Sequence, residues 1–149
     1  TVRRRTEYLE RVDPMATSFK LVINDPATGK SYNFEVTGHH AQNFLNKKIG
    51  DQVDGINANL PGYKLQVTGG SDKAGFPMRG DFEGSVRRRL LLTEGVGYHP
   101  TDYPGKRKRQ SVRGNRISPE IVQVNLTVAK AGSKPVGDHF ANLAEQKKA

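Results

Sequence analysis

The sequence contains no cysteine and no tryptophan, and aromatic residues are only 7% of the chain. The absence of cysteine excludes disulfide bonds, thiolate nucleophiles and zinc sites built on cysteine ligands. Hydrophobic residues make up 34% of the 149 residues, and no stretch approaches the roughly 18 apolar residues of a membrane-spanning helix. The length fits one domain, with or without a tail, and is too short for two comfortable domains.

Patterns that carry catalysis or bind cofactors are also missing. The segment Thr28–Ser31 ends like a phosphate-binding P-loop, but Asn24 stands where that pattern needs its first glycine. The four histidines show no i,i+4 pairing, and no pair of carboxylates lies in an apolar stretch that would raise a pKa. We therefore predict no catalytic residue, no metal site and no cofactor.

What the chain does have is positive charge, unevenly distributed. It carries 24 Lys and Arg against 15 Asp and Glu, a net charge of +9. Residues 74–116 alone hold ten basic and four acidic side chains, so two thirds of the excess lies in this block. A concentrated basic block favours a polyanionic partner.

The densest part of the block is Lys106–Arg116, with six cations in eleven residues and no acid. Like charges this close repel one another, whereas contacts with phosphates release counterions and reverse the cost. Upstream aromatic residues could stack on splayed bases. A solvated face or a localisation signal is the alternative, but two basic clusters with glycine hinges favour RNA. The expected RNA-binding residues are Lys73, Arg79, Arg87, Arg88, Arg89, Tyr98, His99, Tyr103, Lys106, Arg107, Lys108, Arg109, Ser111, Arg113 and Arg116.

Alternation of apolar and polar residues predicts a mainly β fold. Five runs have period two or are compatible with a strand, and a Pro/Gly turn at 25–30 joins the first two into a hairpin. The runs lie at about 18–24, 31–36, 63–68, 85–93 and 122–128. His39–Lys48 is the best helix candidate. We expect a small antiparallel barrel or half-open barrel with one or two short helices and a long basic loop.

The domain organisation follows from these features. Met15-Ala16-Thr17 resembles a start of translation, so residues 1–14 are an extension of uncertain origin. Residues 15–134 form the predicted β domain, whose basic loop spans 95–116. Residues 135–149 form a C-terminal tail or a weak helix.

Four sequence segments, taken in their order along the chain, indicate a protein family more specifically than the amino-acid composition does. Gly69–Lys73, Gly75–Met78, Arg88–Leu92 and Arg107–Gly114 closely resemble small-subunit ribosomal protein S-six of the archaeal and eukaryotic type. The resemblance covers about residues 18–134, and the end of the chain near residue 149 is similar to the archaeal form.

This resemblance implies a structural, non-catalytic constituent of the small ribosomal subunit that supports translation. It further implies a cytoplasmic, ribosome-bound protein whose partners are small-subunit rRNA and neighbouring small-subunit proteins. The alternative from another class is a free RNA-processing or RNA-modifying enzyme on a small β domain. Sedimentation distinguishes the two, because only the ribosomal protein would migrate with the small subunit until high salt releases it. A role outside the ribosome stays open, since Ser111 lies in a basic setting.

Overall fold

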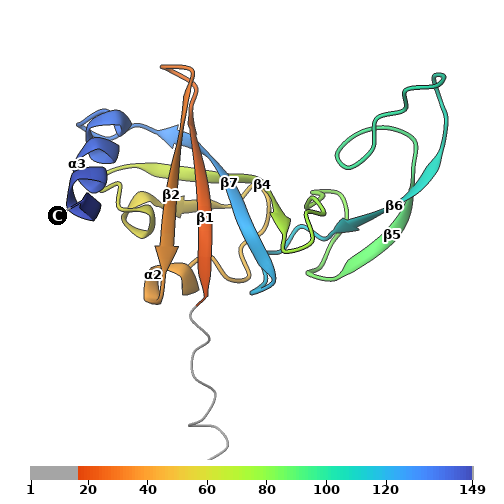
Figure 1. Cartoon of the computed structure of the whole chain (residues 1–149), viewed down its shortest axis with the longest axis horizontal. Helices are drawn as coiled ribbons and strands as arrows, with labels where there is room; N and C mark the ends of the chain where they lie inside the picture. The colour runs from red at the N-terminus through yellow and green to blue at the C-terminus, as the bar shows by residue number, and fades with distance from the viewer. Residues whose placement is uncertain (1–16, 149) are drawn as a thin grey trace, which may run out of the picture.

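The computed structural model describes residues 17–148, with side chains described as far as Glu145 (Figure 1). The extension expected at 1–14 lies outside the described residues. Within them, seven strands and few helices confirm a mainly β fold. In chain order the elements are β1 Ser18–Asp25, β2 Lys30–Thr37, α2 His39–Gln42, β3 Gln52–Asp54, the 3-10 helix η1 Gly55–Ala58, β4 Lys64–Asp72, β5 Arg87–Leu92, β6 Lys108–Arg113, β7 Ile121–Lys130 and α3 Val136–Lys148.

The first two strands form the predicted hairpin, in register from Ser18 opposite Thr37 to Asp25 opposite Lys30. Asp25 holds the turn, because its carboxylate accepts hydrogen bonds from the main-chain N–H of Ala27 at 3.1 Å and from the hydroxyl of Thr28 at 2.9 Å. The motif that resembles a P-loop is therefore a hairpin turn, as predicted.

Five strands form one sheet in the order β2-β1-β7-β4-β3, which curls into a half-open barrel (Figure 1). Most pairs are antiparallel, but β1 and β7 run parallel from Lys20 opposite Gln123 to Asn24 opposite Thr127. Sequence alternation cannot predict this pairing, because a strand that is half buried looks the same beside a parallel or an antiparallel neighbour. The sheet leaves β2 and β3 as its two edges.

The core fills the concave side of this sheet. The inward residues of β1, Phe19, Leu21 and Ile23, have no exposed surface, and neither do Val124 and Leu126 of β7. Burying a large apolar side chain stabilises the fold by about 1.5–3 kcal/mol. The alternation found in the sequence therefore identifies the inward-facing side of these strands correctly.

The helix expected over His39–Lys48 is wrong beyond its first turn, because α2 ends at Gln42. Asn46 then adopts a left-handed conformation, with φ of 63°. Its main-chain N–H donates to the carbonyl of Ile117 at 3.0 Å, and the N–H of Ile49 donates to that of Asn115. These bonds to a distant segment replace the ones a longer helix would make.

The loop expected over 95–116 is also wrong in its second half. Residues 108–113 form β6, which pairs with β5 in register from Arg87 opposite Arg113 to Leu92 opposite Lys108. This two-stranded hairpin projects from the barrel on the side away from α3 (Figure 1). The sequence of β6 does not indicate a strand, because charged residues occupy positions on both of its faces and no alternation of apolar and polar residues is visible.

Candidate nucleic-acid interface

The register of the β5–β6 hairpin divides its basic residues between two faces, because side chains directly opposite each other across a strand pair lie on the same face. One face presents Arg87, Arg89 and Leu91 of β5 together with Arg109, Ser111 and Arg113 of β6. The other presents Arg88, Leu90 and Leu92 with Lys108, Gln110 and Val112. The basic runs, which look continuous in the sequence, are thus split by the pleat.

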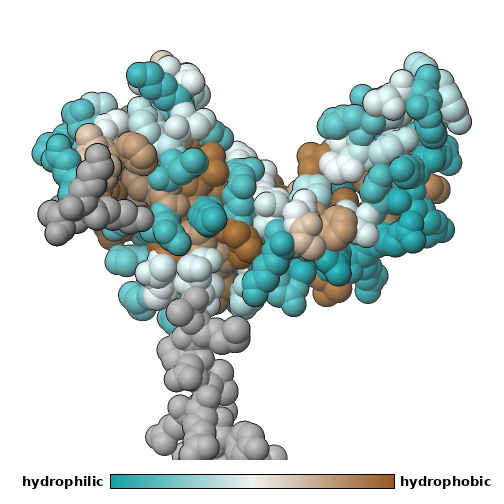
Figure 2. Space-filling model, in the orientation of Figure 1, coloured by the Kyte–Doolittle hydropathy of each residue, from teal (hydrophilic) through white to brown (hydrophobic). Residues whose placement is uncertain are grey.

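We call the first face the open face. Arg87, Arg89 and Arg109 are exposed on it, and Ser111 is half-buried beside them. Leu91, at the outer end, is 55% exposed. Hydrophilic residues cover much of the projecting hairpin, with apolar residues between them (Figure 2). Three guanidinium groups and a hydroxyl on one face of a strand pair form a surface that can donate to phosphate oxygens.

The second face is packed against the chain that connects the two strands. Leu92 and Val112 are buried on it, and a methyl group of Val112 lies so close to Gly97 that a Cβ there would come within 2.9 Å. Pro77 packs at the same point. Arg88 and Lys108 are exposed on this face, beside this small apolar cluster.

Arg113 belongs to the open face by register, but it is only 8% exposed. Its Nε donates to Asp72 Oδ2 at 3.0 Å, its Nη1 to the carbonyl of Ser85 at 3.0 Å, and its Nη2 to the carboxylate of Glu120. Desolvation lowers the pKa of Arg113, but the bonds to Glu120 and Asp72 outweigh this and raise it. The guanidinium therefore anchors the hairpin to the barrel, because each of its three nitrogens donates to a protein acceptor.

Asp72 is the centre of this anchor. Its Oδ1 accepts the main-chain N–H groups of Ala74 and Phe76, each at 2.9 Å, which fixes the turn that runs from Asp72 to Phe76. Burial raises the pKa of the carboxyl, but the bonds from Arg113 and from these two N–H groups hold it below its ordinary value. Arg87 lies 3.8 Å from Asp72 and stacks over the ring of Phe76, so the turn also orients a cation of the open face.

Arg79 is a second anchor. Its Nε donates to Asp81 at 2.6 Å, and its Nη1 donates to the carbonyl of Val96 at 2.9 Å. The side chain is 16% exposed. Arg79 therefore holds the connection between the two strands against the base of the hairpin. The sequence analysis listed Arg79 among the expected RNA-binding residues. In the structure, its Nε and Nη1 both donate to protein acceptors.

The remaining predicted residues lie around the hairpin. At its outer end, Lys106 is paired with Asp102, and Tyr103 is 61% exposed. Tyr98 is half-buried and exchanges main-chain hydrogen bonds with Gly95. His99 and Arg107 are exposed as well. At the base of the hairpin Lys73 is exposed, and Arg116 is half-buried.

A groove of about 740 Å³ lies beneath the hairpin, where Lys73, Arg87 and Arg113 meet the turn before β7. The hydroxyl of Ser118 lines it and is buried without a hydrogen-bond partner among the described residues. Lys73 and Arg87 on its walls extend the basic surface from the hairpin onto the barrel, whereas Arg113 and Glu120, which also line the groove, are paired with each other.

Gly114 is one of the glycines of the basic block that the sequence analysis interpreted as hinges. A Cβ at Gly114 would instead lie 2.1 Å from the carbonyl oxygen of Gly84. This glycine allows two main-chain segments to touch at the base of the hairpin. The positioning role of Asp72 could have been suspected from the Gly69–Lys73 motif that contains it, whereas no sequence signal singles out Glu120.

Other kinds of site find no support in residues 17–148. Among them, no group of three or more His, Asp or Glu side chains could hold a metal ion. None of the described helices is long and apolar enough to cross a membrane.

Comparison with known proteins decides the family. The sequence profile of ribosomal protein S6e matches residues 19–141, which include the hairpin and both of its anchors. The chain belongs to the ribosomal protein S6e family. This confirms the resemblance found in the sequence, and the protein is a structural ribosomal protein and not an enzyme.

Individual relatives of this S6e protein match 83–87% of its length. Small ribosomal subunit protein eS6 of Methanocella arvoryzae is 57% identical over 129 residues, which are 87% of this chain and 89% of that protein. The protein of the same name from Methanoculleus marisnigri is 48% identical over 83% of this chain and 92% of its own length. That of Archaeoglobus fulgidus is 46% identical over 85% of this chain and 98% of its own.

Proposed function

We propose that this S6e protein is a structural constituent of the small ribosomal subunit and that the open face of its hairpin lies along rRNA. The relatives described above carry small-subunit names. The observation that supports the rRNA contact is the register of β5 and β6, which gathers Arg87, Arg89 and Arg109 on one uncovered face. We expect the protein in the cytoplasm, bound to ribosomes beside other small-subunit proteins.

The chemistry of the open face suits sugar and phosphate. Each arginine presents a planar fork that can bind a phosphate through two hydrogen bonds, and Ser111 adds a hydroxyl donor. Such contacts fix the position of a protein on RNA without reading its sequence. Lys73 in the groove, and Arg107 and Tyr103 at the outer end, extend the contact along the hairpin, while Arg113 and Arg79 act as its anchors.

Two matched double variants test this proposal. Arg89→Ala with Arg109→Ala removes two cations from the open face, and Arg88→Ala with Lys108→Ala removes two from the opposite face. Both variants change the net charge equally, and none of the four side chains is buried. Binding to in vitro transcribed small-subunit rRNA is measured as a function of salt.

We expect the open-face variant to bind more weakly at low salt and to lower the slope of log K against log salt by about two, close to one for each lost phosphate contact. The opposite-face variant should keep a slope near that of the unaltered chain. Equal losses in the two variants would mean that the charge acts only through its total, and the proposed face would then be wrong.

A further inference from the structure

The groove beneath the hairpin has apolar walls as well as cations. Its volume of about 740 Å³ lies within the range of pockets that hold a small organic molecule, about 300–1,000 Å³. Val86 and Pro119 both line it and are exposed, and Val86 is 58% exposed. A sugar–phosphate backbone alone would leave this apolar surface without a partner, whereas the face of a base would cover it.

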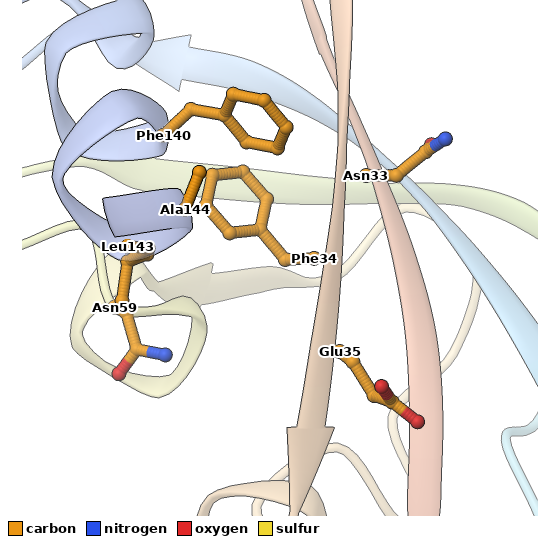
Figure 3. A pocket seen from close by; sticks show the side chains of 7 residues that line it. All are labelled: Asn33, Phe34, Glu35, Asn59, Phe140, Leu143 and Ala144. Carbon is orange, nitrogen blue, oxygen red and sulfur yellow. The ribbon is translucent and has the colours of Figure 1, made fainter. Parts of the chain in front are cut away.

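The charge of the groove suits the phosphate of the same nucleotide. Lys73 lines the groove, is exposed and takes part in none of the ion pairs found among the residues whose side chains the structure describes. The groove between β2 and α3 is different, because the residues that line it include no lysine and no arginine (Figure 3). Charge therefore distinguishes the groove beneath the hairpin as the one that suits RNA.

Arg87 joins this groove to the open face. It belongs to the open face by register, and it also lines the groove. Its guanidinium carbon lies 4.9 Å from the centroid of the Phe76 ring, its Nη1 lies 3.8 Å from Asp72 Oδ2, and its side chain is still 46% exposed. A guanidinium held in this way can stack on a base. RNA that follows the open face therefore meets the groove at Arg87.

Main-chain hydrogen bonds hold the walls of the groove together. The N–H of Lys73 donates to the carbonyl of Glu120 at 3.2 Å, and the N–H of Ile121 donates to the carbonyl of Ser118 at 3.0 Å. The first bond joins the turn after β4 to the turn before β7. The hydroxyl of Ser118 is buried without a hydrogen-bond partner among the described residues, so the groove keeps a polar group that the fold does not use. Walls that are formed in advance reduce the entropy lost on binding.

We propose that this groove binds one unpaired nucleotide of small-subunit rRNA, with its base against Val86 and the guanidinium of Arg87 and its phosphate at Lys73. The inference rests on the proposed function and deepens it. The open face needs only sugar and phosphate, whereas the groove needs a base that has left its helix. Proteins recognise single-stranded RNA in this way, by stacking splayed bases on aromatic rings or guanidinium planes.

Two matched variants test the apolar wall. Val86→Ser removes it, and Val96→Ser is the control, because Val96 is 53% exposed and does not line the groove. Both variants keep the net charge, and Lys73→Ala tests the phosphate contact separately. Binding to in vitro transcribed small-subunit rRNA is measured as a function of salt. Acylation of 2′-hydroxyl groups reports which nucleotides are flexible in the free and in the bound rRNA.

We expect the natural chain to protect one unpaired nucleotide from acylation at the groove. Val86→Ser should restore the reactivity of that nucleotide and weaken binding about fivefold at every salt concentration, because the lost contact is apolar. Lys73→Ala should instead lower the slope of log K against log salt by about one. Val86→Ile keeps the apolar surface and should behave like the natural chain, as should Val96→Ser.

Two results would overturn this inference alone, provided that Arg89→Ala with Arg109→Ala still binds more weakly than the natural chain. One is equal binding by Val86→Ser and Val96→Ser, and the other is a natural chain that protects no unpaired nucleotide. A natural chain that does not bind small-subunit rRNA at all would overturn the proposed rRNA contact as well.

Discussion

Arg109 and Arg113 lie four residues apart on the same face of β6, yet their surroundings differ. Arg109 is exposed, whereas Arg113 is surrounded by Asp72 and Glu120 and by the carbonyl of Ser85. In the sequence they are two cations of one basic run. Arg113 differs from Arg109 because it is bonded to Asp72, which is 41 positions away in the sequence. Sequence analysis could therefore predict the basic surface but not which of its cations is bound within the fold.

Replacing Arg113 should therefore lower the stability of the fold, and any loss of RNA binding should follow from this. Arg113→Ala leaves the carboxylate of Asp72 buried without its main partner, which costs about 3 kcal/mol or more. Arg113→Lys should recover only part of this, because an ammonium cannot bond three acceptors in the same planar arrangement. Urea unfolding measures the effect, with Arg109→Ala as the control, which should change stability by less than about 0.5 kcal/mol. Equal stability of Arg113→Ala and Arg109→Ala would contradict the anchor.

The same anchor predicts a dependence of stability on pH. The folded pKa of Asp72 lies below its ordinary value, which is about 3.9 in an unfolded chain. The ionised carboxylate therefore contributes stability that is fully present above this value and is lost as the pH falls through the lower, folded pKa. The difference in unfolding free energy between the natural chain and Asp72→Asn should be constant near neutral pH and shrink below about pH 4.

This difference isolates Asp72. Asp81 and Glu83 also have lowered pKa values, through Arg79 and Lys48 respectively, but they titrate in both chains and cancel. If this difference stays the same from neutral pH down to about pH 3, the contribution of Asp72 to the free energy of unfolding does not depend on the charge of its carboxylate, and the predicted role of the ion pair is wrong.

At the level of elements, the sequence predicted those that follow one simple periodicity. β1, β2, β4 and β7 have apolar residues mainly on one face, with Val22 of β1 as an exception, and each was found. β6 was missed because its inward residue Val112 stands almost alone in a charged segment. The hairpin is held together by the small apolar cluster of Val112, Leu92 and Pro77 around Gly97, which no local pattern reveals, because its members are far apart in the sequence.

Within this cluster, a substitution at Gly97 should have a large effect on packing. Its φ is 92°, and a Cβ there would lie 2.9 Å from Val112, so Gly97→Ala combines backbone strain with a clash. We expect a loss of about 1–3 kcal/mol in the stability of the hairpin. Hydrogen exchange should accelerate at the amides of β5 and β6 while those of β1 and β7 stay protected. Gly105→Ala is the control for strain alone, because Gly105 has φ of 84° and open space around it. Unchanged exchange in Gly97→Ala would contradict the packing of the loop on Val112.

At the scale of the whole molecule, charge and apolar surface are separated. The β5–β6 hairpin, which carries much of the basic block, projects at one end of the molecule, and helix α3 lies at the other (Figure 1). A groove lined by Phe34, Phe140 and Leu143 lies beside α3. The barrel carries the hairpin, and the ion pairs of Asp72 with Arg113 and Arg87 hold the two together.

The most direct test is a side-chain-resolution map of the small ribosomal subunit that contains this chain. Our account predicts the guanidinium groups of Arg89 and Arg109 within hydrogen-bonding distance of rRNA phosphates, with Arg113 still bound to Asp72 and Glu120. An open face directed to solvent, with no nucleotide near either arginine, would contradict it.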